Sequence, residues 1–168
     1  MIKNIFIILI LLSLSAAAFG FGSKEKSSST GQELKYLDKY EKQWINKGIK
    51  NYTQELIYSR GNFPPEHITI TVSNNTVQNW TTGSGYKFFT EDFIESLTVE
   101  NMFKKARKNL NPESNSPFKF NISYNEELGY IKIFSCIADN NENKNIKPLL
   151  DKNYRFEVIS LKNAKGDL

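Results

Sequence analysis

The alternation of apolar and polar residues over residues 67–73 constrains this chain more than any other feature, because it requires a half-buried β-strand. Apolar side chains occupy every second position and therefore share one face of the strand, at Ile68, Ile70 and Val72. Asn74-Asn75 follows directly, and asparagine tolerates the positive φ angles of a tight hairpin turn. Residues 76–82 are then expected to return as the antiparallel partner strand.

The same reading of periodicity extends to the rest of the domain. Apolar residues at a spacing of three to four predict helices over residues 33–47 and 98–110, the second with Thr98 as N-cap. Strands are predicted over residues 52–59, 67–73, 76–82, 118–124, 130–137 and 153–161. Residues 130–137 are apolar on both faces, which is typical of an internal strand. The order α-β-β-β-α-β-β-β predicts an α+β fold, with a mainly antiparallel sheet and both helices packed on one face.

Residues 1–22 have the order of a secretory signal peptide. A short segment with Lys3 precedes an apolar run over residues 5–14, and small residues follow. The small side chains that signal cleavage requires are Ala16, Ala18, Gly20 and Gly22. We expect the mature chain to begin between Phe19 and Ser23 and to be periplasmic or secreted. The alternative is an uncleaved N-terminal anchor, for which the apolar run is slightly short.

Residues 23–32 are polar and rich in serine and lysine, as expected of a tether, and residues 33–168 are expected to form a single domain. The 168-residue chain carries a net charge of +4 and shows no concentrated basic stripe, so we expect no nucleic acid partner. Cys136 is the only cysteine, which excludes an internal disulfide and a cysteine-rich zinc site. The fold must therefore be held by its apolar core.

None of the candidate chemical motifs is complete. His67 is the only histidine, and it lies on the polar side of its predicted strand without a recognisable nucleophile context. Residues 139–143 resemble the start of a calcium loop, but Lys144 and Leu150 occupy the positions that require glycine and glutamate. We therefore expect no cofactor, no metal site and no catalytic residue of a known type.

Two charged clusters are interpreted as ordinary surface. The densest basic cluster lies in the second predicted helix, opposite its apolar stripe, at Lys104, Lys105, Arg107 and Lys108. The acidic cluster precedes that helix, at Glu91, Asp92 and Glu95. Both are expected to be solvated.

Several short motifs, in this order, resemble a bacterial family of secreted domains known as domain of unknown function 6174. They are Trp44, Asn51-Tyr52-Thr53, Pro64-Pro65 before the 68–72 strand, Asn75-Thr76-Val77, residues 98–103, residues 124–130 and Asp139. The chain departs from the family pattern at Asn125, where aspartate is usual, and at Ile131, where proline is usual. The resemblance spans nearly the whole mature chain and implies an exported domain. It implies no enzyme activity.

The sequence therefore favours a non-enzymatic binding or interaction module over its alternative, a hydrolase or other envelope enzyme with an unrecognised site. In the hairpin, Ile68, Ile70, Val72 and Val77 are expected to face the helices. Unless a bulge intervenes, Trp80 then lies on the opposite face with Thr69 and Thr71, and these three are the candidate binding residues. The expected partner is another envelope protein or envelope component, with no transmembrane domain left after signal removal.

Overall fold

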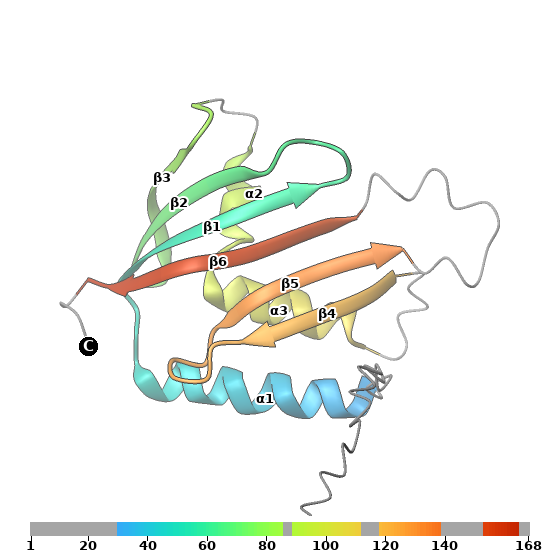
Figure 1. Cartoon of the computed structure of the whole chain (residues 1–168). Helices are drawn as coiled ribbons and strands as arrows, with labels where there is room; N and C mark the ends of the chain where they lie inside the picture. Colours follow the sequence, from blue (N-terminus) through green and yellow to red (C-terminus); the bar gives the residue numbers. More distant parts are fainter. Residues whose placement is uncertain (1–29, 86–88, 112–117, 139–152, 165–168) are drawn as a thin grey trace, which may run out of the picture.

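The computed structural model describes residues 30–85, 89–111, 118–138 and 153–164. This part of the chain forms a six-stranded antiparallel sheet with helices on one side, which confirms the α+β prediction (Figure 1). The helices are α1 (Thr30–Lys47), α2 (Glu91–Glu95) and α3 (Val99–Asn109). The strands are β1 (Tyr52–Arg60), β2 (Glu66–Ser73), β3 (Thr76–Thr82), β4 (Phe118–Tyr124), β5 (Ile131–Ala138) and β6 (Tyr154–Asn163).

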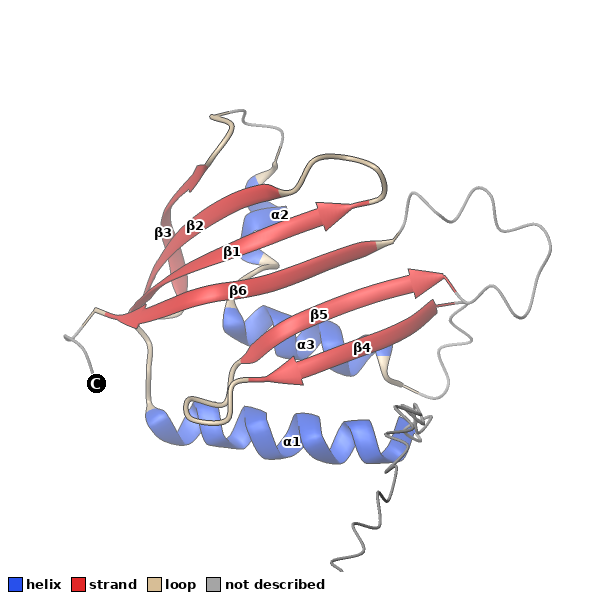
Figure 2. Ribbon diagram, viewed as in Figure 1, coloured by secondary structure: helices blue, strands red, loops and turns tan. Residues whose placement is uncertain are grey.

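The strand order is β3-β2-β1-β6-β5-β4, so two three-stranded meanders meet at the β1–β6 pair (Figure 2). This central pair joins the first and last strands, with Tyr52 opposite Asn163 and Leu56 opposite Val158. Strands so distant in sequence become neighbours only in the folded chain. β5 is internal, as predicted, although Ile137 on its far side is 53% exposed.

The β2–β3 hairpin turns at the predicted residues. Asn74 and Asn75 have φ angles of 50° and 61°, the left-handed values that a two-residue hairpin loop needs. A register shift follows at once, because Val72 pairs with Val77 whereas Thr71 pairs with Asn79. The extra residue on β3 forms a β-bulge. Every later side chain in that strand therefore lies on the opposite face from the one that strict alternation predicts.

The helices differ from prediction in three details. α1 begins at Thr30 rather than at residue 33, so it includes the end of the expected tether. The short helix α2 was not predicted; its N-cap is Thr90, whose hydroxyl accepts a hydrogen bond from Phe93 N at 3.2 Å. Thr98 is the N-cap of α3 as predicted, but its hydroxyl donates to Glu95 O at 3.0 Å and makes no side-chain cap hydrogen bond.

The core lies between the helices and one face of the sheet, here called the inner face. α1 contributes Leu37 and Trp44, α3 contributes Phe103, and the sheet contributes Phe134 and Phe156, all of them buried. The two long helices are also joined by Arg107, which forms ion pairs with Asp38 and Glu41 of α1. None of the helices in the described residues is both long enough and apolar enough to cross a membrane.

Candidate functional site

An aromatic pocket of about 480 Å³ opens on the inner face, near the last residues of β1 and β5. Figure 1 shows that these two strands end on the same side of the sheet. The pocket volume lies in the range of small-molecule sites. Strands β1, β4, β5 and β6 form one side, and α2 and α3 form the other. The pocket is lined by Tyr58, Arg60, Phe93, Lys105, Asn109, Phe118, Phe120, Cys136, Tyr154 and Phe156.

Lys105 of α3 is the main charged group of this aromatic pocket. Its Nζ lies 4.7 Å from the ring centre of Tyr154 and 4.7 Å from that of Phe156. Ring faces attract a cation, which holds the ammonium group in place. Burial lowers the pKa of Lys105, and the nearby Cys136 thiol opposes that shift. Within the described residues, the structure records no ion pair for Lys105.

Tyr58 and Arg60 form the β1 side of the pocket. Tyr58 stacks on Phe156 with ring centres 5.3 Å apart and meets Phe93 edge-on at 5.1 Å. Burial raises the pKa of Tyr58, while the charge of Arg60 and its hydrogen bond to the hydroxyl oppose this shift. The ten described residues that line the pocket include the side chains of Lys105 and Arg60 and no carboxylate, so this part of the lining is aromatic with basic groups.

Cys136 lies in the pocket wall, but it is poorly suited to act as a nucleophile. Burial raises the pKa of its thiol, and the opposing effects of a hydrogen bond with Tyr154 and of the Lys105 charge are smaller. Only the thiolate attacks efficiently. The pocket therefore has the chemistry of a binding site more than that of a thiol-dependent active site.

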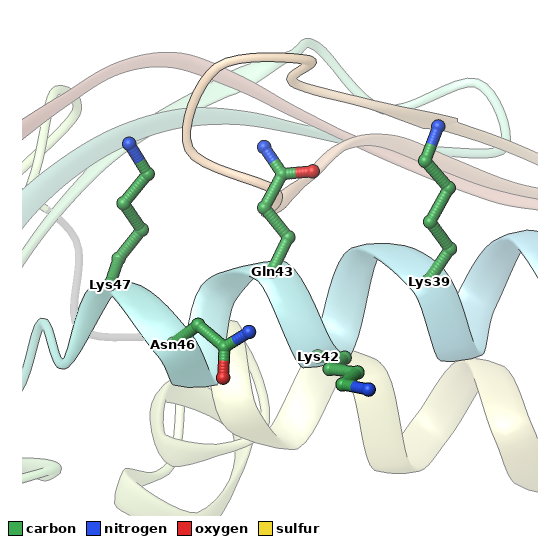
Figure 3. Close-up of a pocket in the computed structure, with 5 residues that line it drawn as sticks. All are labelled: Lys39, Lys42, Gln43, Asn46 and Lys47. Atoms are coloured by element: carbon green, nitrogen blue, oxygen red, sulfur yellow. The ribbon is translucent and has the colours of Figure 1, made fainter.

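A second hollow, of about 410 Å³, follows the surface of α1. Figure 3 shows Lys39, Gln43 and Lys47 projecting upward from the helix, with Lys42 and Asn46 on its adjoining side, toward the viewer. The amide of Gln43 is already bound, because Nε2 donates to Glu126 O at 2.7 Å and to Glu127 O at 3.0 Å. All the lining residues come from one helix, so no second element of the described chain encloses a ligand there.

The structure separates the three predicted binding residues. Thr69 and Thr71 lie on the outer face of the sheet, as expected, with Thr71 exposed. Trp80 was expected on the outer face unless a bulge intervened, and the bulge is present: it places Trp80 opposite Ile70, and the half-buried side chain packs against the core. The three residues therefore do not share a surface.

The structure does not bring together the other residues that the sequence analysis considered for catalysis or metal binding. His67 is exposed on the outer face, opposite Ile57, whereas the pocket opens on the inner face. Glu91, Asp92 and Glu95 are exposed on α2, in agreement with their interpretation as solvated charge. In the part of the chain that the structure describes, no three potential ligands are grouped as a metal site would require. The partial calcium motif at residues 139–150 lies outside the described residues.

Lys105 is the residue that sequence reasoning misplaced. It was assigned to the solvated side of its helix with Lys104, Arg107 and Lys108, but it is half-buried and lines the pocket. One position is about 100° around a helix, so Lys105 lies on the flank of the stripe that contains Phe103 and Ala106. Periodicity identifies such a flanking position but does not say whether another element covers it.

Comparison with protein families shows that residues 36–142 fit the model of a family of unknown function, DUF6174. The match covers most of the chain, from α1 to beyond β5. Comparison with curated proteins and with solved structures gives no match.

Proposed function

This chain belongs to the family of unknown function DUF6174, and we propose that it is a non-enzymatic binding module whose ligand site is the aromatic pocket. One observation carries the proposal: the ammonium group of Lys105 is held over two aromatic rings, with no ion pair recorded for it in the described residues. A partly desolvated charge of this kind is costly unless a partner compensates it. A bound ligand can provide that compensation.

A hydrolase, the alternative reading, receives less support from the same geometry. General base catalysis by histidine needs the imidazole within reach of the substrate, and His67 lies on the opposite face of the sheet from the pocket. Cys136 lies in the pocket, but its thiol pKa is raised by burial. These two residues are therefore poor candidates for a histidine–cysteine pair.

The proposal includes export to the periplasm or the cell exterior, with retention by an uncleaved N-terminal segment as the alternative. Its support is the order of charge, apolar run and small residues over residues 1–22. In that setting the ligand is an envelope component, presented free or by another envelope protein.

The test is a fluorescence titration of the mature chain with N-phenyl-1-naphthylamine, an uncharged probe that brightens in apolar surroundings. Lys105→Trp should block the pocket, whereas Lys108→Trp places the same bulk on the exposed side of the same helix. We expect saturable binding to wild type and to the Lys108 variant, and its loss in the Lys105 variant. Near-UV circular dichroism verifies that each variant is folded. A folded wild type that does not bind the probe would contradict the proposal.

A further inference from the structure

We infer that the ligand of the aromatic pocket is a small organic anion with a planar aromatic ring, whose negative charge pairs with Lys105. This inference rests on the proposed function and adds the chemical class of the ligand. It is carried by the placement of charge and of ring surface around the pocket.

Lys105, from the α3 wall, is the charge that the proposal uses. Among the described residues that line the pocket there is no aspartate or glutamate. A cationic ligand would be repelled by the Lys105 ammonium group. An anionic ligand would form charge-assisted hydrogen bonds with it, which are stronger than those between neutral groups.

The preference for an aromatic ligand follows from the walls. Six of the ten lining residues are phenylalanine or tyrosine. Four of these rings form a continuous set: Phe93 lies 5.1 Å from Tyr58, Tyr58 lies 5.3 Å from Phe156, and Phe156 lies 5.2 Å from Tyr154 between ring centres. Rings prefer offset stacked or edge-to-face contacts with other rings. A planar ligand can make both kinds of contact here, and the pocket volume of about 480 Å³ accommodates a molecule of a few rings.

The geometry of Lys105 also argues against a quaternary ammonium ligand, the usual occupant of an aromatic cage. The ammonium group of the lysine already lies over the faces of Tyr154 and Phe156. The cation–π position at these two rings is therefore taken by the protein itself. What the ligand must supply is the opposite charge.

The test compares two probes that share a ring system and differ in one sulfonate: 1-anilinonaphthalene-8-sulfonate and the uncharged N-phenyl-1-naphthylamine. Each is titrated into mature wild type, Lys105→Met and Lys108→Met. A hydrogen bond to a charged group contributes enough binding free energy for about a tenfold difference in affinity. We therefore expect wild type to bind the anionic probe about tenfold more tightly than the uncharged probe. Lys105→Met should lose this preference while retaining the uncharged probe. Lys108→Met should behave as wild type, because Lys108 is an exposed cation on the same helix.

The possible outcomes separate the two proposals. If neither probe binds the folded wild type, the binding function itself fails. If both probes bind equally, or if the preference survives in Lys105→Met, the pocket is a binding site but the anionic ligand is wrong. If Lys105→Met does not give a native near-UV spectrum, the same titrations are made with Lys105→Gln, which is neutral but polar. Loss of the preference for the anionic probe in that variant supports the proposal, and its survival contradicts it.

Discussion

The indole nitrogen of Trp44 donates a hydrogen bond to Oε1 of Glu100 at 3.0 Å, linking two residues 56 positions apart. The other carboxylate oxygen of Glu100 accepts from the Tyr52 hydroxyl at 2.8 Å, and that hydroxyl accepts from Val99 N at 3.1 Å. One carboxylate therefore ties α1, β1 and the start of α3 together. Trp44 and Tyr52 are almost fully buried, so their polar groups depend on this partner.

Removing that partner should destabilise the fold strongly. Glu100→Leu leaves the Trp44 N–H and the Tyr52 hydroxyl without their acceptor, and each such loss costs about 1–3 kcal/mol. We expect the free energy of unfolding, measured in urea, to fall by about 2–4 kcal/mol. Glu100→Gln keeps an acceptor and should cost less. Glu95→Leu, at an exposed position on α2, is the control and should change stability by less than about 0.5 kcal/mol.

Alanine substitutions at Gly129 and Gly48 separate two costs: the strain of a left-handed backbone and the steric clash of an added Cβ. Both have positive φ, 87° and 63°, but a Cβ at Gly129 would lie 2.8 Å from Tyr40 O, whereas nothing lies within 4 Å at Gly48. Gly48→Ala should therefore cost only the left-handed strain, about 1–2 kcal/mol. Gly129→Ala should cost clearly more, because the β4–β5 turn must move away from α1. If both variants lose the same free energy of unfolding in urea, the β4–β5 turn moves away from α1 at no measurable cost.

Trp80→Ala should reduce stability without changing probe binding. The side chain is half-buried against the core, and truncation of a fully buried tryptophan costs about 3–5 kcal/mol, so a loss of about 2 kcal/mol is expected here. Trp80 does not line the aromatic pocket, and the uncharged probe should bind as before. Thr81→Ala, at an exposed neighbouring position, is the control for thermal unfolding. Unchanged stability together with lost binding would restore Trp80 as a ligand contact.

Cys136 should react with thiol reagents at least about tenfold more slowly in the folded chain than in the urea-unfolded chain, because buried thiols are unreactive. Burial raises the pKa of the Cys136 thiol, so the thiolate fraction at neutral pH is reduced, and the rate should increase with pH over a higher range than in the unfolded chain. Tyr154→Phe removes a hydrogen bond that lowers this pKa and should slow the reaction further. Rapid labelling, or a covalent dimer lost on reduction, would contradict a buried, unbridged thiol.

The mature chain should begin between Phe19 and Ser23 if residues 1–22 act as a secretory signal. Replacing Ala16, Ala18, Gly20 and Gly22 with bulky residues should block cleavage, since signal peptidase needs small side chains near the cut. N-terminal sequencing of the natural protein measures this directly. An intact Met1 in the membrane fraction would instead identify an N-terminal anchor.

The sequence alone determined most of the helices and strands, because these depend on patterns within a few residues. Alternation at Ile68, Ile70 and Val72 identified β2, and Asn74-Asn75 identified its turn, since asparagine adopts left-handed φ at little cost. The family was also recognisable, from short motifs in a conserved order along the chain. Neither inference needed to know which segments meet in space.

Only the tertiary structure decided the pairing of β1 with β6 and the content of the pocket. Strand order depends on contacts between residues about 100 positions apart, which periodicity does not encode. One extra residue in β3 turned Trp80 to the inner face, and bulges leave little trace in a sequence. Lys105 lies on the flank of an amphipathic helix, where its burial depends on the aromatic side chains of β6 that fold over it. The candidate site is therefore a property of the assembled sheet and helices.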